Sequence, residues 1–372
     1  MNKLIRILHV IGSMNRGGAE AMIMNLYRQI DRERLQFDFV ENTLQPAAYD
    51  DEIRSLGGRI FNCPHYNGLN HAAYLRWWNR FFREHSGEFS IVHGHLGSTA
   101  AFYLSAAKKA GLYTIAHSHN TNGVGPADLL YRLYAFPTRF IADSFFACSA
   151  DAGRDRFGRA VASDPSRFFV LNNAIDTKRF AFDPTVRKAV REKLNIAENE
   201  LLIGHVGRFV AQKNHTFLVD VFSEMYRRNN KVKLLLIGKE DPEKKIRAKV
   251  QLLGLSERVI FTGIQEHPEA FYQAMDVFIF PSLFEGLGMA VVEAQASGLP
   301  CIISDTIPKE CILTDDLVSV CSLDDRPSSW AECALSRISE DRSDHSHVIA
   351  ARGYDICRTS QWLTDFYCSK VS

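Results

Sequence analysis

The chain has 372 residues, of which 46% are hydrophobic and 23% charged, and its formal net charge is +1. This length is more than one core needs and predicts two domains, while the near-neutral charge gives no indication of nucleic-acid binding. No apolar run approaches the ~20 residues of a bilayer-spanning helix. The eight cysteines contain no C-x-x-C pair, which predicts free thiols in a reducing compartment.

Short apolar runs alternate with helical segments through the first half of the chain. The first run, 4–11, lacks a small-residue cleavage site and predicts a strand rather than a signal peptide, so we expect a cytoplasmic protein. Further strands are predicted at 37–40, 59–62, 90–93, 113–116, 145–147 and 168–171. This alternation is typical of a parallel sheet covered by helices on both faces.

The same rhythm restarts after a connector at 172–184. Strands are predicted at 201–206, 233–237, 259–261, 277–280 and 301–303. We therefore predict an α/β protein of two doubly wound, Rossmann-like domains, 1–175 and 176–349, that face each other across a cleft. Ligands of such sheets bind outside the carboxyl ends of the strands, so the loops that follow strands are the place to look for a site.

The loop after the first strand contains Gly17 and Gly18 just before a helical pattern. Glycines at a helix start let an anion approach bare amides and the positive end of the helix dipole. A dinucleotide fingerprint, G-x-G-x-x-G, is absent. We predict a phosphate or sugar-nucleotide contact here, although glycine also serves turns that need a positive φ.

Two loops of the second half carry charged residues suited to a phosphorylated sugar. Arg208 and Lys213 follow the strand at 201–206, and they could neutralise a diphosphate or form an ordinary solvated turn. Glu285 follows the strand at 277–280, and Glu293 lies one turn inside the next helical pattern. Because carboxylates accept hydrogen bonds from neighbouring hydroxyls, both are candidate sugar or ribose ligands.

Two His-x-His pairs, His93/His95 and His117/His119, end adjacent predicted strands. Residues two apart on a strand point the same way, so a metal site, a lining of the cleft and a structural role are all open. No carboxylate or cysteine stands at ligand spacing, and we predict no metal.

The aromatic and arginine-rich segments 74–83 and 129–140 also allow two interpretations: a core-facing helix with a cationic outer face, or a helix on an anionic membrane surface.

With these motifs the chain resembles retaining GT-B glycosyltransferases of family four, especially bacterial enzymes that build exopolysaccharide and capsule. The resemblance covers nearly the whole chain and rests on segments 17–20, 115–120, 173–180, 207–214 and 284–294. It implies that 1–175 binds the acceptor, that 176–349 binds the nucleotide sugar, and that a last helix, about 350–372, packs back onto the first domain.

The resemblance also implies roles for the candidate residues. Arg208 and Lys213 would hold the donor diphosphate, and Glu293 the ribose. The donor sugar would meet Glu285 and the backbone of Gly286, Leu287, Gly288 and Met289; Gly17 and Gly18 would meet a phosphate; His119, or else His117, would lie beside the sugar.

We therefore expect a sugar to be transferred with retention from a nucleoside diphosphate sugar, UDP favoured, to a glycan or a lipid-diphosphate-linked acceptor. Fixed cations would make a metal unnecessary, and no cofactor is expected. The expected partners include an anionic membrane surface and no nucleic acid, so a peripheral position at the inner face of the plasma membrane is one option. The alternatives are a sugar-nucleotide epimerase on the same scaffold and a non-catalytic sugar-nucleotide-binding subunit.

Overall fold

A computed structural model describes residues 4–15, 17–119, 134–238, 243–265, 267–338 and 342–371. The chain divides into two compact units, Met1–Ile175 with Ile356–Ser372, and Asp176–Asp355. Within the described residues, no helix combines the length and the apolar character needed to cross a membrane.

The first unit is built on a parallel sheet with the strand order β3-β2-β1-β4-β5-β6-β7. Its strands are β1 (Ile5–Ile11), β2 (Leu35–Glu41), β3 (Ile60–Asn62), β4 (Ile91–Gly94), β5 (Tyr113–Ser118), β6 (Ser144–Ala147) and β7 (Phe168–Val170). Its helices are α1 (Gly18–Gln29), α2 (Asp50–Ser55), α3 (His71–Glu84), α4 (Ala100–Lys109), α6 (Thr138–Ile141), α7 (Ala150–Phe157), α8 (Arg159–Ala162) and α17 (Ile356–Ser369).

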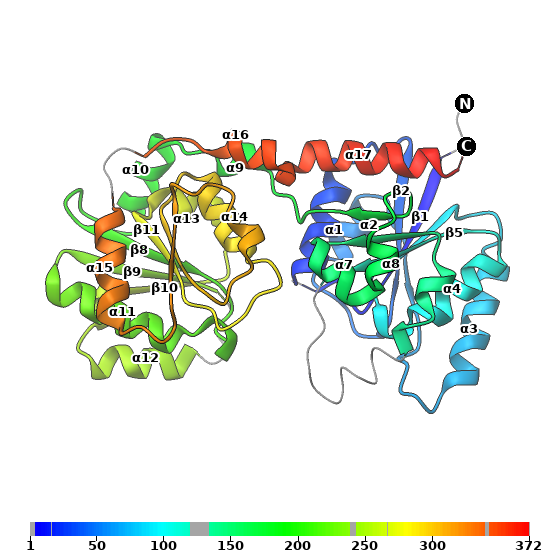
Figure 1. Cartoon of the computed structure of the whole chain (residues 1–372), viewed down its shortest axis with the longest axis horizontal. Helices are drawn as coiled ribbons and strands as arrows, with labels where there is room; N and C mark the ends of the chain where they lie inside the picture. The colour runs from blue at the N-terminus through cyan, green and yellow to red at the C-terminus, as the bar shows by residue number, and fades with distance from the viewer. Residues whose placement is uncertain are drawn as a thin grey trace. The chain divides into compact units, whose positions relative to one another are not determined.

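Alternate side chains of each strand serve two separate cores of this unit. Ile7 packs in a cluster with side chains of α1 and α17, whereas Leu8 packs in a cluster with side chains of α3 and α4. Because neighbouring side chains of a strand point to opposite faces, a buried parallel sheet needs apolar residues at almost every position. Figure 1 shows α17, in red, beside β1 and β2.

The second unit has a parallel sheet with the order β10-β9-β8-β11-β12-β13. Its strands are β8 (Leu201–Val206), β9 (Val232–Ile237), β10 (Val259–Gly263), β11 (Val277–Phe280), β12 (Cys301–Ser304) and β13 (Val318–Cys321). Its helices are α9 (Thr177–Phe180), α10 (Pro184–Lys193), α11 (His215–Arg228), α12 (Glu243–Leu252), α13 (Pro268–Ala274), α14 (Met289–Ala296), α15 (Pro327–Arg337) and α16 (Ser346–Ile349). Helices lie on both faces of this sheet as well (Figure 1).

The predicted strands are confirmed, with ends that shift by one or two residues, and one strand was missed. The missed strand is β13, an edge strand of four residues, none of which is fully buried. Such a strand carries no run of apolar residues, so its pattern does not stand out from a loop.

The aromatic stripe of α3 belongs to the core. Tyr74, Trp78, Phe81 and Phe82 are buried, while the intervening arginines point outward. The second aromatic segment differs: its residues 129–133 lie outside the described part, but Phe136 and Phe140 are exposed, and Phe140 retains 76% of its accessible surface. The membrane interpretation is therefore better supported by 134–140 than by α3.

Candidate active site

The predicted donor-binding loops meet at the carboxyl ends of the central strands of the second sheet. In the order β9-β8-β11, the chain switches from one side of β8 to the other, and loops at such a switch point leave a crevice for ligands. The backbone N–H of Leu283 donates to the Gln212 carbonyl at 2.8 Å. The side-chain amide of Gln212 donates to the Phe284 carbonyl, also at 2.8 Å. These two bonds tie the loop after β8 to the loop after β11.

Lys213 and Glu285 form an ion pair across these two loops. Lys213 Nζ lies 2.7 Å from Glu285 Oε1, and the side chains retain only 15% and 9% of their accessible surface. Lys213 Nζ also lies 4.5 Å from the centre of the Phe280 ring. Arg208 belongs to the same loop, but its side chain is exposed and makes no hydrogen bond or ion pair to the described residues. Lys213 and Glu285 thus contact each other, although the resemblance implies separate roles for them, with the diphosphate for Lys213 and the donor sugar for Glu285.

Glycines let the chain approach itself closely at this edge. A Cβ on Gly238, at the end of β9, would collide with the carbonyl oxygen of Gly207, at the end of β8. Gly288 has φ +88° and immediately precedes α14, so it holds a backbone conformation that other residues rarely adopt. Gly286 is exposed, whereas Leu287 is buried. Because glycine has no side chain, the exposed surface of Gly286 is backbone, whereas Gly288 itself is buried.

Glu293 lies inside α14 and is held by a tyrosine. The hydroxyl of Tyr272, from α13, donates to Glu293 Oε2 at 2.8 Å. Burial raises the pKa of Glu293 to about 7, whereas the Tyr272 hydrogen bond and the charge of Lys213 act in the opposite direction. Near neutral pH this carboxyl is thus poised between its two protonation states.

The glycine loop of the first unit already has a carboxylate at its helix start. Gly17 is the N-cap residue of α1, and the Glu20 carboxylate lies where a Cβ of Gly17 would stand. Among the residues that the structure describes, and apart from its chain neighbours, no atom lies within 4 Å of the position that a Cβ of Gly18 would take. A phosphate that binds the amides of this helix start must therefore displace the Glu20 side chain, because two anions cannot share the place.

Five buried or half-buried histidines of the first unit form two hydrogen-bonded strips. In the His9 strip, His9 Nδ1 lies 2.9 Å from His95 Nε2, and His95 Nδ1 lies 2.8 Å from His119 Nε2. In the Tyr367 strip, the Tyr367 hydroxyl lies 2.6 Å from His93 Nδ1, and His93 Nε2 lies 3.1 Å from His117 Nδ1. Burial holds the pKa of every one of these histidines below its ordinary value, so the rings are neutral.

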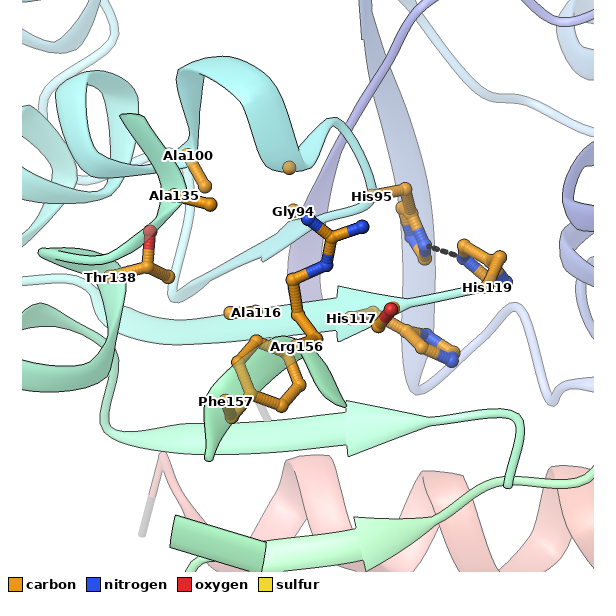
Figure 2. A pocket seen from close by; sticks show the side chains of 12 residues that line it. Gly94, His95, Ala100, Ala116, His117, His119, Ala135, Thr138, Arg156 and Phe157 are labelled. Atoms are coloured by element: carbon orange, nitrogen blue, oxygen red, sulfur yellow. Dashed lines mark hydrogen bonds between the residues drawn. The ribbon is translucent and has the colours of Figure 1, made fainter. Parts of the chain in front are cut away.

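The two strips are stacked on each other beside a small cavity. The ring centres of His93 and His95 lie 4.5 Å apart, and those of His117 and His119 lie 4.1 Å apart. Figure 2 shows the hydrogen bond between His95 and His119, with His117 next to them at the end of β5. These three residues help to line a cavity of about 80 Å³ that also contains Arg156.

The histidine cluster is a poor match for a metal ion despite its short distances. One nitrogen from each of His95, His117 and His119 falls within 4.8 Å of the others. A metal binds an imidazole along the in-plane lone pair of its nitrogen, whereas stacked rings present their faces to each other. The His117 and His119 rings lie face to face in this way, with centres 4.1 Å apart and planes inclined by only 31°.

Sequence reasoning missed three residues of these sites. His9 was read only as part of a strand, although it pairs in register with His93 on the neighbouring strand. Tyr367 lies in the last helix, which was expected only to pack onto the first domain, and Tyr272 carried no signal. The common cause is that each acts on a residue far away in the sequence.

Comparison with known proteins bears on both units. Residues 186–347 match the family model "Glycosyl transferases group 1", and residues 16–179 match "Glycosyltransferase Family 4". The putative glycosyltransferase EpsF of Bacillus subtilis is 39% identical over 97% of this chain and 96% of its own length. The capsular polysaccharide biosynthesis glycosyltransferase CapH of Staphylococcus aureus is 24% identical over 99% of this chain and 100% of its own.

A solved structure has the same fold. Anabaena HepE, in complex with UDP and glucose, superposes with a TM-score of 0.77 over 98% of this chain and 100% of its own, at 17% identity. The two parallel α/β sheets thus match the GT-B architecture. By these matches along both units, the chain belongs to the family 4 glycosyltransferases.

Proposed function

We propose that this glycosyltransferase moves a sugar from a UDP-sugar to a glycan or lipid-diphosphate-linked acceptor, with retention of configuration, in the biosynthesis of exopolysaccharide or capsule. The observation that carries the proposal is the Lys213–Glu285 ion pair. It lies at the switch point of the second sheet, between two loops that hydrogen bonds join to each other. Supporting it are the names of the Bacillus and Staphylococcus relatives and the UDP and glucose of the Anabaena complex.

The mechanism assigns the leaving diphosphate to cations and amides rather than to a metal. Negative charge grows on the diphosphate as the glycosidic bond breaks, so fixed positive groups stabilise the transition state more than the ground state. Arg208 and Lys213 supply that charge, and the start of α14 adds backbone N–H groups. The leaving phosphate oxygen then accepts the proton of the acceptor hydroxyl on the same face of the sugar, so no protein nucleophile is needed.

The remaining candidates orient the sugar and the nucleotide. Glu285 accepts hydrogen bonds from sugar hydroxyls while Lys213 is shared with the diphosphate, and the backbone of Gly286, Leu287, Gly288 and Met289 completes the sugar contact. We assign the ribose hydroxyls to Glu293. In the first unit, we assign a phosphate to Gly17 and Gly18, and the sugar to His119 with His117 next to it.

The acceptor proposal includes an anionic membrane surface. Phe136 and Phe140 are exposed, and the Arg139 guanidinium lies 4.8 Å from the centre of the Phe136 ring. Aromatic rings with a neighbouring cation suit the head-group region, where a lipid-linked acceptor presents its diphosphate. This arrangement supports a peripheral position at the inner face of the plasma membrane.

A donor screen followed by product analysis tests the proposal. Thermal shifts with UDP- and GDP-sugars should single out a UDP-sugar, and that donor should be hydrolysed slowly alone and transferred to a lipid-diphosphate-linked acceptor. Epimerised donor in the absence of acceptor would instead identify an epimerase. Donor binding without hydrolysis or transfer would identify a non-catalytic subunit.

A further inference from the structure

The first unit has a groove lined by arginines at the amino ends of β6 and β7. It measures about 460 Å³ and runs between α6, the junction of α7 and α8, and the start of β7. Its lining includes Arg139 of α6, Arg159 of α8 and Arg167, which immediately precedes β7. A hollow of this size falls within the range of about 300–1,000 Å³ that small-molecule sites occupy.

Two of these arginines carry charge that no carboxylate balances. Within the described part of the chain, the exposed Arg159 makes no hydrogen bond or ion pair, and the half-buried Arg139 donates only to a backbone carbonyl of α7, at 3.4 Å. Arg167 differs, because it donates to two backbone carbonyls. Asp164 is the one carboxylate among the described residues that line the groove, and it accepts two hydrogen bonds from Ser166. The groove is therefore more positive than its own carboxylate can balance.

A glycine and an exposed phenylalanine complete the groove. Gly158 has φ +81°, and a Cβ at this position would stand 3.0 Å from Arg139 Nη1, so the glycine leaves room for the guanidinium. Phe140 also lines the groove and keeps 76% of its accessible surface. A guanidinium fork matches the oxygens of a phosphate, and an exposed aromatic ring suits the head-group region of a bilayer. Both kinds of contact are met together by a phospholipid.

We propose that the groove between α6 and α8 binds the phosphate of an anionic membrane phospholipid through Arg139 and Arg159, with Phe140 in the head-group region of the bilayer. The inference rests on the peripheral membrane position in the proposed function, and it adds an anchoring lipid that is distinct from the acceptor. The groove lies at the amino ends of β6 and β7, whereas Gly17 and His119, which we assign to the phosphate and the sugar, follow the carboxyl ends of β1 and β5. A lipid in the groove therefore holds the first unit on the membrane without taking the place of the reacting sugar.

Vesicle binding by the full chain tests the groove. Co-sedimentation is measured with vesicles of phosphatidylcholine alone and with vesicles that also contain phosphatidylglycerol, which the wild type should bind more tightly. Arg159→Gln should lower the partition coefficient for the anionic vesicles about fivefold, the contribution of one cation near an anionic surface. The matched control is Arg154→Gln, which removes the same charge from an exposed arginine of α7 that already pairs with Asp151. This control should change the partition coefficient little.

Arg159→Lys separates phosphate recognition from general charge. Lysine keeps the positive charge and lacks the planar fork, so a phosphate held in the groove predicts binding between that of the wild type and that of Arg159→Gln. Equal binding by Arg159→Gln and Arg154→Gln, or by Arg159→Lys and the wild type, would overturn the groove as a phosphate site. Equal binding of the wild type to both kinds of vesicle would overturn the groove and contradict the membrane position in the proposed function as well. The assay contains neither donor nor acceptor, so its result is independent of sugar transfer.

Discussion

Replacing Lys213 with alanine removes the cation that pairs with Glu285 and that we assign to the donor diphosphate. Two losses should follow, and they can be measured separately. A donor group aimed at charge that develops in the transition state contributes about 3–4 kcal/mol, so kcat/KM should fall by about 10²–10³. The substitution also leaves the carboxylate of Glu285 without its ion-pair partner, although only 9% of this side chain's surface is accessible to water.

The stability cost is smaller than that of a fully buried pair. Removing one partner of a fully enclosed ion pair costs about 3–5 kcal/mol. Because Lys213 keeps 15% of its side-chain surface in water, solvent can reach the vacated place and screen Glu285. We therefore expect unfolding to become easier by about 1–3 kcal/mol, too little to account for the predicted loss of rate at 25 °C.

The control for this experiment is Lys233→Ala. Lys233 pairs with Glu200 at 3.0 Å in the same unit, and the two side chains keep 16% and 14% of their surface. Urea denaturation should report a somewhat smaller destabilisation for the control, because Arg258 also contacts Glu200. Steady-state assays with donor and acceptor should find its rate close to wild type. A folded Lys213→Ala variant with near-wild-type kcat/KM, or an equal loss in Lys233→Ala, would refute the assignment.

Three further predictions concern other parts of the chain. Burial raises the pKa of Glu293 from 4.5 to about 7, so the stabilisation that its protonated form gives the folded state is complete below pH 4.5 and is lost as pH rises. As the pH rises to 7, wild type should therefore lose about 3 kcal/mol of unfolding free energy relative to Glu293→Gln. A difference between the two proteins that stays constant across urea titrations in that range would contradict this. Gly238→Ala should destabilise the protein by about 1–3 kcal/mol, because its Cβ meets the Gly207 carbonyl oxygen, and thermal unfolding at the wild-type Tm would show that the strand ends can separate freely. Phe140→Asp should weaken co-sedimentation of the protein with anionic vesicles. The control Leu252→Asp changes an 86% exposed position of the second unit and should not weaken it. Equal vesicle binding by both variants would exclude the surface around Phe140 as a membrane contact.

The fold and the charged loops could be predicted because their signals are local. A buried parallel strand needs a short run of apolar residues, and a doubly wound sheet needs helices between such runs, so β8 and β11 were found with their observed limits. The charged and glycine residues after these strands could then be placed at one edge, because parallel strands end together. Strand β13 was missed because a short, half-buried edge strand lacks that run.

The sequence by itself determined the two sheets and the loops that carry Lys213 and Glu285, whereas the strand order, and with it the switch point, came from the tertiary structure. Only the tertiary structure decided that these two residues, 72 positions apart, pair with each other. It likewise decided that Tyr367 reaches His93 across 274 positions. The physical reason is that hydrophobic periodicity encodes which residues are buried, whereas the partner of a buried polar group depends on how distant elements stack and on the hydrogen bonds that each such group must satisfy.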